Sequence, residues 1–170
     1  LTQLTKNSKN YKWEILWSPD SKKILCSDKT MSLYYIDIDS KKTTEIVKSK
    51  AWEIRDYSWS PDSKWVAYSD GLLNGNSAIF IYSLDSKKIE QVTDEYFACV
   101  SPRFSDCGKF LFFTSNRTFS PTINSLEWNF SFNNMLKIYG ITLQDTVQSP
   151  FAFESDETAA KADDEATKEK

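Results

Sequence analysis

Histidine is absent from the 170 residues, and glycine, methionine and cysteine are scarce, with four, two and three residues. Without histidine, the chain cannot complete a Ser-His-Asp or Cys-His catalytic centre, an imidazole proton shuttle or a zinc site with histidine ligands. It also has no uninterrupted apolar run long enough for a transmembrane helix. Aromatic residues reach 15%, and this composition favours pleated sheets over a helical bundle, which predicts an all-β fold.

An excess of basic charge is also missing. The chain has 21 basic and 24 acidic side chains, a net charge of −3, which argues against a nucleic-acid backbone or an anionic membrane surface as partner. The negative charge is concentrated in 154–170, which has seven acidic residues, three lysines and no apolar periodicity. We therefore expect 154–170 to be a disordered acidic linker or tail.

No cofactor or metal motif accompanies the three cysteines. Cys26, Cys99 and Cys107 are too few for a disulfide framework, and no two of them form a Cys-x-x-Cys pair. Glycine-rich phosphate loops, Gly-x-Ser-x-Gly elbows and calcium loops are also absent from the sequence. The sequence predicts free, buried thiols and no cofactor, metal site or catalytic residue.

One six-residue motif occurs three times. Trp-Ser-Pro-Asp-Ser-Lys occupies 17–22 and 59–64, and a diverged copy, Phe-Ser-Asp-Cys-Gly-Lys, occupies 104–109, at offsets of 42 and 45 residues. Two apolar stretches follow each copy, and the first two copies add an Asp-Ser-Lys-Lys turn and a further strand pattern. This spacing predicts four antiparallel strands per repeat.

The motif itself is typical of a hairpin turn. Pro19 and Pro61 suit the first corner of a type I turn, and the position that closes the loop in a left-handed conformation holds Ser21, Ser63 or Gly108. Successive four-stranded sheets are what β-propeller blades need, because radial stacking buries both faces of each sheet. We therefore expect a partial β-propeller of about three four-stranded antiparallel blades.

The phase of the repeats sets the expected boundaries. Residues 2–5 align with the outer-strand segment 90–93, which predicts that 1–5 is the end of a preceding blade. The partial propeller is expected to cover 1–153, with blades at 11–47, 52–93 and 98–153 and an insertion at 117–133. No fourth strand pattern is evident in 146–153. Three blades form an open arc, so both flanks are expected to need partners.

The insertion concentrates side chains that are common in recognition sites. The candidate contact residues for a peptide or an interface are Arg117, Phe119, Glu127, Trp128, Phe130 and Phe132. Loops on rigid scaffolds often bind partners, and exposed aromatic and arginine side chains are frequent interface anchors. Two interpretations stay open: these residues pack on the channel rim or a neighbouring blade, or they contact another domain, a subunit or a peptide.

The repeats resemble those of three known propeller families. The motif copies and 103–117 resemble repeats of TolB-type, prolyl-oligopeptidase-type and tricorn-type proteins. The stretch 125–139, followed by Ser149-Pro150-Phe151 and an acidic segment, is similar to the propeller region of tricorn proteases. The resemblance implies a non-catalytic scaffold and peptide-access channel of a tricorn-type serine peptidase, whose catalytic residues lie in later domains and match no position here.

The resemblance also implies partners. They are the remaining blades and catalytic domains of the parent chain, peptide substrates, and other copies of the parent in a homo-oligomer. A cytoplasmic location is expected, with an exported or periplasmic one as the alternative. The alternative function is a TolB-like binding module for protein–protein interaction without enzymatic activity, and a third option is the propeller cap of a prolyl-oligopeptidase-like enzyme.

Overall fold

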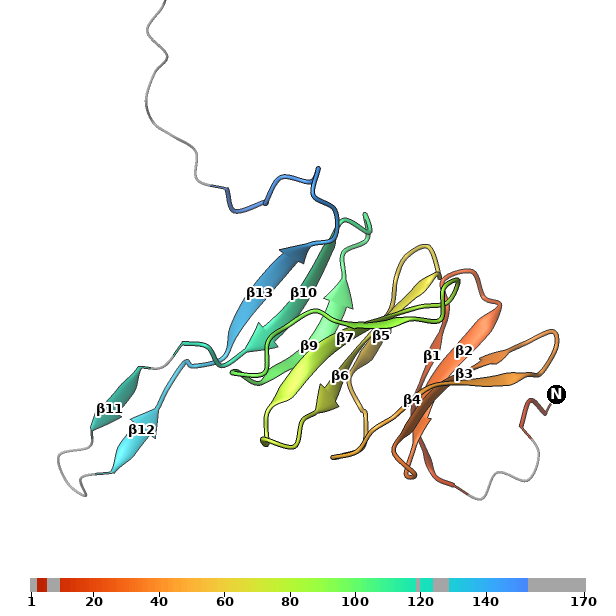
Figure 1. Cartoon of the computed structure of the whole chain (residues 1–170), viewed down its shortest axis with the longest axis horizontal. Coiled ribbons are helices and arrows are strands. Elements are labelled where there is room, and N and C mark those ends of the chain that lie inside the picture. Colours follow the sequence, from red (N-terminus) through yellow and green to blue (C-terminus); the bar gives the residue numbers. More distant parts are fainter. Residues whose placement is uncertain (1–2, 6–9, 119, 124–128, 153–170) are drawn as a thin grey trace, which may run out of the picture.

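The computed structural model describes residues 3–5, 10–118, 120–123 and 129–152. These residues contain thirteen strands and no helix, and therefore no helix long and apolar enough to cross a membrane. The strands form three sheets and one separate hairpin, which follow one another along the chain (Figure 1). The predicted all-β class with successive antiparallel sheets is confirmed.

The first two sheets have the same architecture, with four antiparallel strands in sequential order. The first sheet contains β1 (Lys12–Trp17), β2 (Lys23–Asp28), β3 (Ser32–Asp37) and β4 (Thr43–Lys48). The second contains β5 (Tyr57–Trp59), β6 (Trp65–Gly71), β7 (Ser77–Ser83) and β8 (Ile89–Gln91). Trp17 pairs with Ile24 as Trp59 pairs with Val66, so corresponding positions of the two sheets can be compared directly.

The third sheet has only three strands in the described part of the chain. It contains β9 (Cys99–Phe104), β10 (Phe110–Ser115) and β13 (Lys137–Thr142), with β10 in the centre. The insertion contributes β11 (Pro121–Ile123) and β12 (Phe130–Phe132), a hairpin that projects away from the sheets (Figure 1). After β13, residues 143–152 form turns and irregular backbone instead of a fourth strand.

The predicted turn chemistry is confirmed at the loop-closing position. Ser21, Ser63 and Gly108 adopt left-handed φ values of 59°, 61° and 68°. In the first turn, the Ser18 hydroxyl donates to the Asp20 carboxylate at 2.6 Å and accepts the Lys23 N–H at 2.9 Å. The second turn repeats this pattern, so the aspartates stabilise both hairpins.

The first strands of the three sheets lie close together. The Tyr57 hydroxyl donates to the Glu14 carbonyl, and Trp59 Nε1 donates to the Leu16 carbonyl at 3.4 Å, which joins β5 to β1. Arg103 donates to the Tyr57 carbonyl at 2.8 Å, which joins β9 to β5. The edge formed by β1, β5 and β9 is therefore the converging, inner edge of the stacked sheets.

Residues 3–5 reproduce contacts made by the end of the second sheet. Gln3 Nε2 donates to the Thr5 carbonyl at 2.8 Å, and Gln91 Nε2 donates to the Thr93 carbonyl at the same distance. Leu4 packs on the outward face of the first sheet, as Val92 packs between the second and third sheets. These contacts support the assignment of 1–5 to a preceding blade; this and the other predicted boundaries stay predictions, and 154–170 lies outside the described residues.

Candidate functional site

Arg117, the first residue of the predicted contact set, lies at the base of the inserted hairpin and faces inward. Its guanidinium forms an ion pair with Asp94 at 3.3 Å and donates to Cys99 Sγ at 3.6 Å. Three aromatic rings surround the guanidinium at 5.5 to 5.9 Å: Phe97, Phe113 and Tyr139. Arg117 thus packs among side chains of the second and third sheets, and its contact with a peptide or a partner stays a prediction.

The other predicted contact residues are spread over the hairpin. Phe130 and Phe132 lie on β12, where Phe130 pairs with Ile123 and Phe132 with Pro121. Phe132 is 54% exposed, and Ile123 across the hairpin is 60% exposed. Phe119, Glu127 and Trp128 lie outside the described residues. The structure therefore brings Phe130 and Phe132 together on one strand and leaves Arg117 in a separate cluster.

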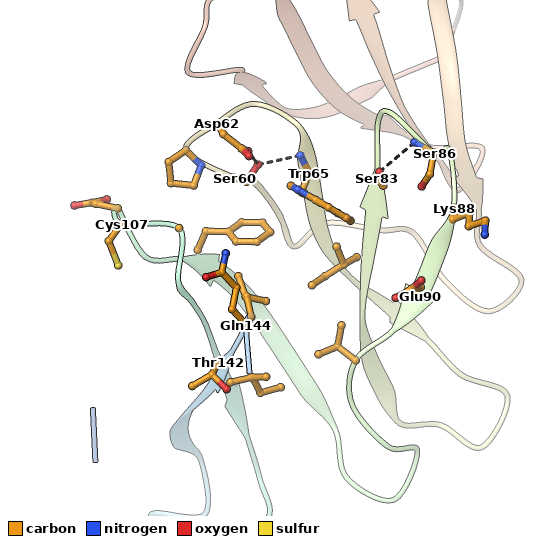
Figure 2. Close-up of a pocket in the computed structure, with 18 of the residues that line it drawn as sticks. Ser60, Asp62, Trp65, Ser83, Ser86, Lys88, Glu90, Cys107, Thr142 and Gln144 are labelled. Atoms are coloured by element: carbon orange, nitrogen blue, oxygen red, sulfur yellow. Dashed lines mark hydrogen bonds between the residues drawn. The ribbon is translucent and has the colours of Figure 1, made fainter. Parts of the chain in front are cut away.

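A groove that the sequence did not reveal lies between the second and third sheets. It has a volume of about 640 Å³ and runs from the β5–β6 and β9–β10 turns to the outer strand β8 and the end of β13. Figure 2 shows Trp65 and Glu90 on its second-sheet side and Cys107, Thr142 and Gln144 on its third-sheet side. Its size is typical of ligand-binding clefts.

Smaller side chains at corresponding positions account for this groove. The first interface lies between the first and second sheets, and the second sheet contributes Trp59 and Tyr82 to it. The second interface lies between the second and third sheets, and at the corresponding positions the third sheet has Phe104 and Ile141. On the opposite side, Leu25 and Tyr35 of the first sheet correspond to Ala67 and Ile81 of the second. The change from Val66 to Leu111 adds volume, but less than the other changes remove, so the second interface loses volume overall.

The rims of the two interfaces also differ. The backbone N–H of Asp20 donates to the Ser63 hydroxyl at 3.0 Å, which ties the first turn to the second. The third turn has Gly108 at the corresponding place, and a Cβ there would meet no atom within 4 Å. In the described part of the chain, the N–H of Asp62 therefore has no hydrogen-bond acceptor of this kind and lies at the edge of the groove.

Cys107 contributes a thiol to the lining of the groove. It is exposed, whereas Cys26 and Cys99 are buried, so the prediction of a buried thiol is wrong for Cys107, because it occupies an exposed hairpin turn. A hydrogen bond from Ser105, aided by the backbone at Lys109, lowers the pKa of the Cys107 thiol. Among the described residues, no group of three or more Cys, Asp or Glu side chains could hold a metal ion.

Successive four-stranded sheets that converge on one edge define the chain as a segment of a β-propeller. The family model of the tricorn protease second β-propeller domain matches the whole chain, residues 1–170. The chain therefore belongs to this family, and it is a propeller part rather than a catalytic part of a tricorn-type protein.

Individual relatives agree with this assignment. A tricorn protease homologue of Saccharolobus solfataricus is 31% identical over 134 residues, which are 79% of this chain and 12% of that protein. The chain thus spans a small part of its curated relative. The crystal structure of the tricorn protease matches with a TM-score of 0.81 and 24% identity over 86% of this chain and 15% of that chain. TolB from Acinetobacter baumannii matches with a TM-score of 0.54 and 22% identity over 74% and 32%, which concerns the fold alone.

Proposed function

We propose that this propeller segment forms part of the wall of a peptide-access channel for proteolysis by other domains of the parent chain. The observation behind the proposal is the inner edge, where hydrogen bonds join β1 to β5 and β5 to β9. A propeller places such an edge around its central channel. The segment contributes scaffold and access, and peptides of the substrate pool are its transient partners.

The open flanks support a need for further blades. On the first sheet, Ile15 and Trp17 are 56% and 59% exposed, although the corresponding Trp59 is buried against its neighbour. On the third sheet, Ile138 is 77% exposed. Apolar faces of this kind are covered by adjacent blades in a propeller. We assign these flanks to the remaining blades of the parent chain; its homo-oligomeric state and cytoplasmic location stay predictions.

The channel is tested in the complete parent protein. Glu14, exposed on the innermost strand β1, is replaced in a Cys107→Ser background by Glu14→Cys and modified with a bulky maleimide polymer. The block should lower kcat/KM for long peptides at least about tenfold and leave a fluorogenic tripeptide almost unaffected. Thr43→Cys, on the outer strand β4, is the matched control. Equal effects at both positions, or none, would contradict the proposal.

The TolB-like binding module is the second candidate, and the shared fold supports it. It predicts that the complete protein binds a partner protein through the propeller and hydrolyses no peptide. A fluorogenic peptide library separates the two candidates, because turnover by protease-free preparations would favour the tricorn-type function and consistent inactivity would favour the binding module.

A further inference from the structure

We propose that the groove between the second and third sheets binds short extended peptide segments in which a lysine or arginine is flanked by apolar residues. This goes beyond the proposed channel, because the groove extends outward between two blades to strand β8 and the end of β13. It would serve as a docking site for a peptide segment, separate from the route along the inner edge.

The floor of the groove is apolar. Ile81 and Val92 from the second sheet face Ile141 and Leu143 from the third. Trp65 adds a large indole that remains 42% exposed. Apolar side chains of a bound segment would remove this surface from water, and a cationic group could lie against the face of the indole.

The charge around the groove favours a cation. Asp62, Glu90 and Asp106 line it together with a single ammonium group, that of Lys88. The carboxylate of Asp62 is already used within its turn, by Ser60 and the N–H of Lys64. Glu90 and Asp106 form no ion pair among the described residues, so they are available to a bound cation. An acidic segment would meet net repulsion at the same place.

The backbone supplies a directional contact. The N–H of Asp62 points from a turn that borders the groove and lacks the acceptor that Ser63 provides for Asp20. A peptide carbonyl can accept this N–H, which favours an extended segment over a compact ligand. Apolar floor, unpaired carboxylates and a backbone donor thus define one kind of occupant.

Occupancy can be measured at Cys107, the exposed thiol that lines the groove. The complete parent protein, treated with diisopropyl fluorophosphate to stop any serine-peptidase activity, is alkylated with iodoacetamide, and Cys107 modification is followed by mass spectrometry. The probes are acetylated and amidated Ala-Leu-Arg-Leu-Ala and the same peptide with Gln or Glu in place of Arg. The assay needs no hydrolysis, so its result does not depend on the channel proposal.

The Arg peptide should slow alkylation at least about threefold at saturation, the Gln peptide should bind more weakly, and the Glu peptide should give no protection. Glu90→Gln should weaken protection by the Arg peptide about two- to fivefold. The control is Glu95→Gln, which removes an exposed carboxylate that follows the C-terminal end of β8, outside the groove lining, and should not weaken protection. Equal protection by the Arg and Glu peptides, or none by either, would overturn the proposal.

Two variants fill the groove. Ile141→Tyr introduces a tyrosine between the second and third sheets, where Tyr82 occupies the corresponding position between the first and second sheets. It should weaken binding of the Arg peptide about tenfold or more. Gln144→Trp adds bulk at an exposed position of the groove without changing the core, and should act in the same direction if Ile141→Tyr does not fold. Undiminished protection by the Arg peptide in a folded groove-filling variant would contradict the assignment.

Discussion

The two inter-sheet interfaces use the same repeat but are packed differently. The first joins its turns through Ser63, and large side chains such as Trp59 and Tyr82 fill the space between the sheets. The second has smaller side chains at those positions and an open groove, and an ion pair between Asp94 and Arg117 joins its other end. The same strand repeat is therefore compatible with one closely packed interface and with a neighbouring interface that contains an open groove.

The largest expected effect comes from making the first interface resemble the second. Leu25→Ala introduces the residue found at the corresponding Ala67, and Leu25 is completely buried. The cavity should lower the free energy of unfolding by about 2–4 kcal/mol, measured by urea denaturation. Leu73→Ala, at a residue that is 89% exposed, is the control and should change little. A loss below about 1 kcal/mol at Leu25 would show that the first interface is not tightly packed.

The next effect concerns the ion pair of the second interface. Arg117→Met keeps much of the side-chain volume but removes the charge that faces Asp94 and three aromatic rings. We expect a loss of about 1–2 kcal/mol in the free energy of unfolding, from the ion pair and the cation–π contacts together. A double-mutant cycle with Asp94→Asn measures the coupling, and additive effects would show that the ion pair contributes nothing.

A smaller effect, of opposite sign in the two sheets, is expected from Asp28 and Asp70, which occupy corresponding places in β2 and β6. Burial alone raises the pKa of Asp28, but hydrogen bonds from the Thr30 hydroxyl and N–H outweigh it and hold the pKa below the ordinary 3.8. Burial raises the pKa of Asp70, and the hydrogen bond from Ser49 offsets this only in part. Acid should therefore affect the two carboxylates differently.

The sign follows from proton linkage. Ionised Asp28 stabilises the fold above its unfolded pKa, and this is lost as the pH falls through the lower folded pKa. Protonated Asp70 stabilises the fold below its unfolded pKa, and this stabilisation is lost as the pH rises through the higher folded pKa. Asp28→Asn should thus destabilise most at pH 7, whereas Asp70→Asn should be neutral or stabilising there. Urea unfolding at pH 7 and near pH 4 checks this; identical pH profiles would refute it.

The smallest effect is local. Ser63→Gly removes the acceptor of the Asp20 N–H but also relieves a left-handed serine, so the two contributions should nearly cancel in overall stability. Amide hydrogen exchange should still report the change: the Asp20 amide exchanges about fivefold faster, and Gly108→Ser slows exchange at Asp62. Equal protection of Asp20 and Asp62 in the unaltered chain would remove this difference between the interfaces.

Much of the fold could be predicted from local sequence. The left-handed closing residues Ser21, Ser63 and Gly108 follow from turn chemistry that involves only near neighbours, and the strand patterns follow from apolar runs. The inward position of Arg117 could not be predicted, because Asp94 and Phe97 lie on a different loop and meet it only when two sheets stack. The groove was missed for the same reason, although aligning Tyr82 with Ile141 would have indicated it.

The order of the residues is enough to set where the chain turns, which stretches become strands and how many sheets follow one another, because these depend on interactions within a few residues and on the period of the repeat. Which interface is filled and which is open is set only when the sheets pack against each other. That outcome depends on the combined volume of side chains from two sheets and on hydrogen bonds between their turns, which form only after stacking.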